Sequence, residues 1–117
     1  PKYFLARKFS EDDLNAAYCA SDIYICPSKY EGFGFPPLEG FIFCDNVIAS
    51  CTTSVGEITD SFATQVNPEN VEDVASAIKS VLESPKMFTE TEKGNIFSKF
   101  SWDRCASETL DVYKRLI

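Results

Sequence analysis

Short apolar runs alternate with segments of helical periodicity along this chain of 117 residues, and the alternation constrains the fold more than any other feature. The runs cover residues 3–6, 23–26, 47–50 and 63–66. Strands that alternate with helices over short connections favour a parallel sheet with helices on both faces. The sequence therefore predicts an α/β fold. Four strands are few for such a sheet, which suggests a truncated domain.

The helical segments carry start and stop signals. Ser10 precedes three acidic residues and is expected to cap a helix that fades near residue 21. Further helices are expected over 36–43, 71–82, 88–100 and from 101 onward, with one helical turn at 55–58. We expect residues 1–117 to form one partial domain whose C-terminal helical tail starts at about residue 101. Aromatic residues near that tail are expected to pack in a core or against another domain: Phe97, Phe100, Trp102 and Tyr113.

Composition excludes several classes of function. Hydrophobic residues make up 44% of the chain, as in globular domains, and histidine is absent, so a Ser-His-Asp triad or a His-ligated metal site cannot form. The formal net charge of −7 opposes unspecific binding to nucleic acid or to an anionic membrane. No nucleic-acid partner is therefore expected.

The five cysteines lack the Cys-x-x-Cys spacing of zinc and redox sites, so no metal site is expected. Several lie in apolar segments, where cysteine behaves as a small hydrophobic residue. Reduced, buried thiols in a cytoplasmic protein are the favoured interpretation.

The segment from Glu31 to Glu39, E-G-F-G-F-P-P-L-E, carries the main chemical signal. It follows a predicted strand and enters a predicted helix, at the strand end where open parallel sheets bind ligands. Its two glycines would let the backbone approach a ligand and adopt positive φ. The first turn of the helix offers amides to a phosphate. Because its two prolines have no N–H, the expected donors are Leu38 and the Gly-Phe-Gly backbone.

Glu31 and Glu39 could each hold a sugar diol, on either side of a diphosphate. The structural alternative is that these acids only complement a helix dipole and that Gly-Phe-Gly is a tight turn. A single Gly-x-Gly does not decide between the two interpretations.

Residues 25–39, I-C-P-S-K-Y-E-G-F-G-F-P-P-L-E, resemble the E-x7-E region of retaining GT-B glycosyltransferases of family four, the glycosyl transferases group 1. The family pattern there reads P-S-x-x-E-G-F-G-L-P-x-L-E. The similarity continues in order along essentially the whole chain, at residues 9–22, 47–50, 56–58, 66–68 and 100–102. It implies the distal half of the C-terminal, donor-binding domain of such an enzyme, with a Rossmann-like parallel sheet flanked by helices.

The resemblance also implies roles for individual residues. Glu31 would be the catalytic residue, facing the hydroxyls of the donor sugar and helping to stabilise an oxocarbenium-like transition state. The loop backbone would pass along the sugar and phosphates, the amide of Leu38 would reach the diphosphate, and Glu39 would bind the ribose. Transfer would proceed with retention and without a metal or cofactor, the nucleotide-diphosphate-sugar being the donor substrate. The implied donor-binding residues are Gly32, Phe33, Gly34, Phe35, Leu38 and Glu39.

The chain departs from the family pattern directly after Glu39. Small residues are replaced by Phe41, Ile42 and Phe43, so the packing of this helix and the turn beyond it are expected to differ. The basic Arg/Lys pair and the amino-terminal acceptor domain of the family have no counterpart in the chain, and Lys29 is the nearest substitute for the missing charge. Transfer by the chain alone is therefore not expected.

The sequence thus predicts the donor-binding part of a glycosyltransferase of polysaccharide or glycoconjugate synthesis, in the cytoplasm or peripherally at the inner face of the membrane. Because the chain does not begin with Met, it is expected to be part of a longer protein. Its partners would be a nucleotide-sugar and, through the missing domain, an acceptor saccharide or lipid-linked glycan. The alternative is a non-catalytic Rossmann-like module for nucleotide-sugar binding or assembly. An exposed apolar face on the last helix could also drive formation of a homo-oligomer.

Overall fold

The computed structural model of the chain describes residues 8–117. These residues belong to two compact units that divide between Met87 and Phe88, and each unit is described by itself. The elements of the first unit are α1 (Glu11–Ala20), β1 (Tyr24–Cys26), α2 (Phe35–Phe43), β2 (Val47–Ser50), α3 (Thr53–Thr59), β3 (Thr64–Val66) and α4 (Val71–Glu83). The elements of the second are α5 (Glu90–Phe97), the 3-10 turn η1 (Ser98–Phe100) and α6 (Trp102–Leu116).

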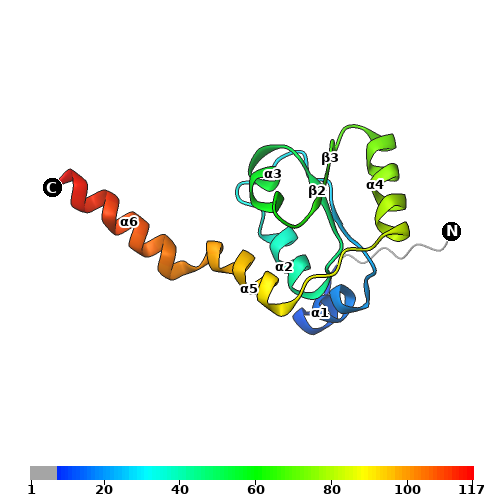
Figure 1. The fold of residues 1–117 in the computed structure, drawn as a ribbon, viewed down its shortest axis with the longest axis horizontal. Helices are drawn as coiled ribbons and strands as arrows, with labels where there is room; N and C mark the ends of the chain where they lie inside the picture. Colours follow the sequence, from blue (N-terminus) through cyan, green and yellow to red (C-terminus); the bar gives the residue numbers. More distant parts are fainter. Residues whose placement is uncertain (1–7) are drawn as a thin grey trace. The chain divides into compact units, whose positions relative to one another are not determined.

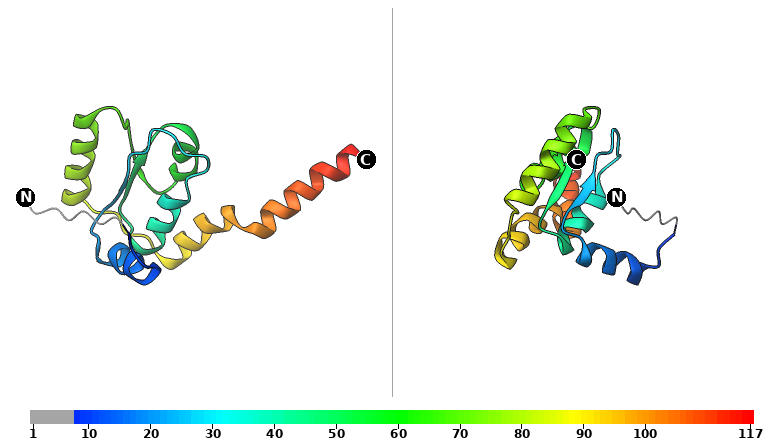
Figure 2. Two further views of the ribbon diagram at one scale, coloured as in Figure 1. Left: turned by 180° about the vertical axis from the view of Figure 1, so that it is seen from behind. Right: turned by 90° about the vertical axis from the view of Figure 1, so that its right-hand side faces the viewer.

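The three strands of the described chain form one parallel sheet in the order β1-β2-β3. Tyr24 of β1 lies opposite Val47 of β2, and Ile48 of β2 lies opposite Thr64 of β3. Helices α2 and α3 lie on one side of the sheet and α4 on the other (Figures 1 and 2). The predicted α/β fold with a Rossmann-like parallel sheet is therefore confirmed. The fourth expected strand, residues 3–6, lies outside the described residues.

The middle strand is the centre of the core. All four residues of β2 are buried, because helices cover both of its faces and a strand pairs with each of its edges. On the α4 side, Ile48 packs in a cluster with Val66 of β3 and with Ala77 and Val81 of α4. The apolar positions of α4 recur at helical spacing, so one stripe of the helix covers the sheet.

Helix α2 accommodates the large residues that distinguish it from the family pattern. Phe41 is fully buried and stacks on Phe62, with ring centroids 4.3 Å apart. Phe43 stacks on Tyr18 of α1 at 5.9 Å. At Gly40 a Cβ atom would lie only 2.6 Å from the ring of Tyr24 in β1. Helix α2 therefore packs on aromatic rings, and a glycine makes room for one of them, while a difference from the packing of other family members stays a prediction.

Two helices differ in extent from the sequence-based expectation. The expected turn at 55–58 is the seven-residue helix α3. The helix expected over 88–100 is shorter, because the capping box of Thr89 and Glu92 starts α5 at Glu90 and a 3-10 turn follows its end at Phe97. Ser10 and Ser101 cap α1 and α6 as predicted, each hydroxyl accepting a bond from a backbone N–H in the first turn.

Several side chains are more exposed than expected. All five cysteines are free thiols, but only Cys26 and Cys44 are buried, so the expectation of buried thiols is wrong for Cys19, Cys51 and Cys105. Trp102 and Tyr113 are exposed and are not core residues of the described chain. Their packing against another domain stays a prediction. Within residues 8–117, no helix has the combined length and apolarity that a bilayer crossing requires.

The contact between Gly40 and Tyr24 is open to a direct test. Gly40→Ala should lower the free energy of unfolding by about 1–3 kcal/mol, because the added methyl group overpacks against the Tyr24 ring. The measurement is urea unfolding followed by circular dichroism.

The matched control is Gly94→Ala in α5, where a Cβ meets nothing within 4 Å. It should cause no loss of stability, because alanine favours a helix over glycine. Adding Tyr24→Leu to Gly40→Ala should restore part of the lost stability. A Gly40→Ala variant as stable as the original chain would contradict this account of α2 packing.

Candidate functional site

The residues predicted to carry chemistry lie at the carboxyl edge of the sheet. Because the three strands are parallel, the loops that follow β1, β2 and β3 all leave from this edge. The loop of residues 27–34 connects β1 to α2 and contains Glu31, Gly32 and Phe33. The side-chain hydroxyl of Ser54, at the start of α3, donates a 2.7 Å hydrogen bond to the carbonyl oxygen of Glu31 and so ties two of these loops together.

Gly34 creates an unusual start for α2. It is the N-cap residue and has left-handed dihedral angles, φ 109° and ψ 41°, which glycine adopts readily. An added Cβ there would lie 3.4 Å from the side chain of Val55 in α3. Gly32 does not have positive φ, so the prediction of two left-handed glycines holds for Gly34 alone.

The first backbone hydrogen bond of α2, at the left-handed cap, is weak. In the other five α-helices of the described chain, the fourth residue donates its N–H to the N-cap carbonyl, as Leu14 does to Ser10. In α2 the first turn still closes on Gly34, because the helix begins at Phe35, but the Leu38 N–H and the Gly34 carbonyl lack the geometry of an ordinary hydrogen bond. Pro36 and Pro37 occupy the second and third positions and have no N–H. Phe35 and Leu38 are therefore the donors of the first turn, and the helix dipole adds positive potential there.

Glu31 is half-buried and held at two points. The hydroxyl of Ser28 donates a 3.0 Å hydrogen bond to its carboxylate, and Ser54 holds its backbone as described above. The carboxylate is thus oriented by the loop that contains it and remains partly open to solvent. This is the environment expected for a group that orients or stabilises a ligand.

Glu39 lies in the second turn of α2 and is exposed. The pKa of the Tyr18 hydroxyl in α1 is raised, first by burial and then by the negative charge of Glu39. The two acids therefore flank the first turn of α2, Glu31 before it and Glu39 after it. Neither is buried in the core, and their side chains are not joined by a hydrogen bond among the described residues.

The remaining predicted site residues differ in exposure. Phe33 and Phe35 are exposed, and their rings lie against each other with centroids 4.7 Å apart. The side chain of Leu38 is buried, so only its backbone can serve a ligand. Across residues 8–117, no three acidic or cysteine side chains converge as the ligands of a metal would. Chemistry without a metal stays a prediction.

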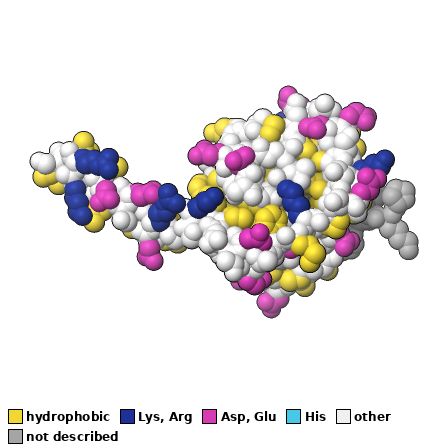
Figure 3. All heavy atoms as spheres, viewed as in Figure 1, with side chains coloured by type: hydrophobic (Ala, Val, Ile, Leu, Met, Phe, Trp, Pro, Cys, Tyr) yellow, Lys and Arg dark blue, Asp and Glu magenta, His cyan; other side chains and the backbone are white. Residues whose placement is uncertain are grey.

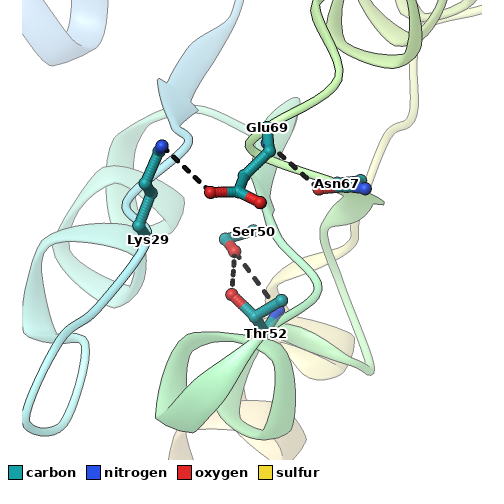
Figure 4. A network of polar contacts seen from close by, with 5 residues as sticks. All are labelled: Lys29, Ser50, Thr52, Asn67 and Glu69. Atoms are coloured by element: carbon teal, nitrogen blue, oxygen red, sulfur yellow. Dashed lines mark hydrogen bonds and ion pairs between the residues drawn. The ribbon is translucent and has the colours of Figure 1, made fainter.

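A polar network at this edge was not found from the sequence (Figure 4). Lys29 after β1 and Glu69 after β3 form an ion pair of 3.0 Å. Ser50, fully buried at the end of β2, shares a 2.8 Å hydrogen bond with the hydroxyl of Thr52. The only sequence signal for the ion pair of Lys29 and Glu69 is that each residue follows a strand, and that the carboxyl ends of parallel strands meet at one edge of the sheet. Forty positions separate them, so local patterns do not connect them.

The fold and this edge define a parallel α/β domain whose expected ligand site is the loop between β1 and α2. Residues 3–99 match the family described as Glycosyl transferases group 1. Since this match covers most of the chain, the chain belongs to that family.

Curated relatives are similar over nearly the whole chain. O-antigen chain mannosyltransferase B of Escherichia coli is 32% identical over 108 residues, which cover 91% of this chain and 28% of that protein. Serotype-specific mannosyltransferase WbdA of Escherichia coli is 30% identical over 110 residues, covering 92% of this chain and 14% of that protein. MMP alpha-(1->4)-mannosyltransferase of Mycolicibacterium hassiacum is 25% identical over 114 residues, which cover 92% of this chain and 28% of that protein. The chain spans less than a third of the length of these relatives. No solved structure matches the chain significantly.

Backbone strain next to the site yields a test. Thr53, the first residue of α3, has φ 57°, which is rare for a β-branched residue. Thr53→Gly should therefore raise the free energy of unfolding by about 1 kcal/mol, because glycine adopts this angle without strain. Denaturant unfolding measures the change.

Thr52→Gly is the neighbouring control, since Thr52 has φ −105° and bonds Ser50. It should lower stability. A loss of stability in Thr53→Gly comparable to that in Thr52→Gly would show that Thr53 is not strained.

Proposed function

We propose that this chain is the donor-binding part of a glycosyltransferase that moves a sugar from a nucleotide-diphosphate-sugar to a saccharide or lipid-linked acceptor, with retention of configuration. The observation that carries the proposal is the first turn of α2, where the weakly bonded amide of Leu38 lies between Glu31 and Glu39 along the chain. The family of the chain and the three relatives described above, each named as a mannosyltransferase, support sugar transfer in glycan synthesis.

The diphosphate would bind at the first turn of α2. The N–H groups of Phe35 and Leu38 would donate to its oxygens, and the helix dipole favours a negative charge there. The backbone of residues 32–34 would pass along the sugar and phosphates, and the absence of side chains at Gly32 and Gly34 would permit the close approach. In this proposal the protein needs no metal or cofactor, and the nucleotide-sugar is the substrate itself.

The two carboxylates would hold the two ends of the donor. Glu39 would accept hydrogen bonds from the ribose hydroxyls, and Glu31 from hydroxyls of the sugar. When the bond between the anomeric carbon and the diphosphate oxygen breaks, its electron pair leaves with the diphosphate and positive charge develops on the sugar ring. The carboxylate of Glu31, already oriented by Ser28, would stabilise that charge. The acceptor oxygen would form the new bond on the same face, and its proton would pass to an oxygen of the departing diphosphate.

The acceptor would bind outside this chain, in an amino-terminal domain, because the chain corresponds to 28% of the length of a relative such as O-antigen chain mannosyltransferase B. We propose synthesis of a polysaccharide or glycoconjugate at the cytoplasmic side of the membrane as its setting. The transfer step is therefore assigned to the longer protein, and donor binding to this chain.

Substitutions of the two carboxylates should have different effects on the affinities for two ligands. Glu39→Gln should weaken a nucleoside diphosphate and the corresponding nucleotide-sugar alike, by about tenfold, because both contain the ribose that it would bind. Glu31→Gln should weaken only the nucleotide-sugar, because the nucleoside diphosphate lacks the hexose. Titrations with GDP, UDP and their hexose derivatives, followed by NMR, measure these affinities.

Glu83→Gln at the end of α4 removes the same charge away from the site and serves as control. It should leave all affinities unchanged. The proposal would be contradicted if Glu31→Gln and Glu39→Gln bound both ligands as the original chain does, and a non-catalytic module would be favoured if the longer protein kept its biological activity with Glu31→Ala.

A further inference from the structure

An ion pair crosses the carboxyl edge of the sheet. Lys29 projects from the loop after β1 and Glu69 from the loop after β3, and their charged groups meet at 3.0 Å. These two strands are the outer strands of the described sheet, so the pair bridges over the end of the middle strand β2. Figure 4 shows both side chains pointing toward each other above Ser50 and Thr52.

The anionic member of the pair is held in place. The backbone N–H of Glu69 donates to the side chain of Asn67 at 3.0 Å, and the backbone N–H of Asn67 donates to Asp73 of α4 at 2.6 Å. Asn70 then caps α4 through bonds from Glu72 and Asp73. Hydrogen bonds therefore fix the turn that contains Glu69. Lys29 has a flexible four-carbon side chain, so its ammonium group can move to another partner.

The ion pair of Lys29 and Glu69 can break at little cost in stability, so Lys29 can exchange Glu69 for another anion. Both side chains are 70% exposed, and ion pairs in that environment contribute little to stability. The other lysines of residues 70–87 are engaged elsewhere. Lys79 pairs with Glu83 on α4, and Lys86 donates at 3.0 Å to the carbonyl of Phe62, which precedes β3 at the opposite edge. Burial lowers the pKa of Lys86.

A diphosphate at the first turn of α2 would need a positively charged side chain nearby, because the chain itself is acidic. The formal net charge is −7, and acidic side chains are spread over the face shown in Figure 3. The first turn of α2 offers backbone amides and a dipole but no basic side chain. A diphosphate carries more negative charge than these groups can balance. Lys29 lies on the same loop as Glu31 and Gly34, directly ahead of that turn.

We propose that Lys29 is the cation for the donor diphosphate, and that Glu69 holds it in the unliganded protein until the diphosphate takes the place of Glu69. The inference rests on the proposed function, because it assigns a further residue to the same donor site. Lys29 acts on the ligand directly, and Glu69 is a positioning residue that competes with the ligand.

The test is a double-mutant cycle on the 117-residue chain, titrated with GDP and with UDP and followed by NMR. Lys29→Met keeps the length of the stem and should weaken binding about tenfold. Glu69→Gln should strengthen binding about threefold, because it releases Lys29 from an exposed pair. In the Lys29→Met background, Glu69→Gln should have no further effect. Glu83→Gln, which breaks the comparably exposed pair of Lys79, should change nothing.

Each other outcome overturns the inference. If Glu69→Gln strengthens binding equally with Lys29→Met present, Glu69 acts by simple repulsion and no exchange occurs. If the original chain binds either nucleotide and neither substitution changes the affinity, the inference fails while the proposed function stands. If the original chain binds neither nucleotide, the proposed function fails and this inference falls with it. Unchanged NMR spectra of the unliganded variants would confirm that both remain folded.

Discussion

The left-handed conformation of Gly34 is the constraint on which the site depends. It turns the chain that leaves β1 into α2, and the Leu38 N–H bonds the Gly34 carbonyl less well than the fourth residue of every other described α-helix bonds its N-cap. The prolines that follow cannot supply an N–H, so a weakly bonded amide and a helix dipole remain at the carboxyl edge of the sheet. Glycine is required there because an L-residue would be strained at φ 109°, although a Cβ would meet Val55 of α3 only at an ordinary contact distance. One backbone conformation therefore sets both the direction of α2 and the chemistry of its first turn.

The packing beneath the site explains how the chain tolerates its departures from the family pattern. Large residues stand in α2 where the family pattern has small ones, and two of them stack on other rings: Phe41 on Phe62 in the core, and Phe43 on Tyr18. Gly40, by contrast, has no side chain and so leaves space for the Tyr24 ring. Close packing makes these choices interdependent, because an added methyl group has no free volume to enter.

Much of the fold could be predicted from the sequence, because its signals are local. The apolar run at 47–50, the caps at Ser10 and Ser101, and the periodicity of α4 correspond to observed elements, with boundaries within one or two residues. The position of Glu31 in a loop at the carboxyl edge followed from strand, glycine and proline order. The contacts that could not be predicted are tertiary. The pairing of Lys29 with Glu69 requires the strand order of the sheet, and the strain at Thr53 requires its dihedral angle. The exposure of Cys51 likewise depends on where α3 begins.

The most direct test of the account is a crystal structure of this chain with a bound nucleoside diphosphate. The account predicts that a phosphate oxygen accepts a hydrogen bond from the N–H of Leu38 and that the ribose hydroxyls lie within hydrogen-bonding distance of the Glu39 carboxylate. A nucleotide bound away from the first turn of α2, for example at the opposite edge of the sheet beside Lys86, would contradict it.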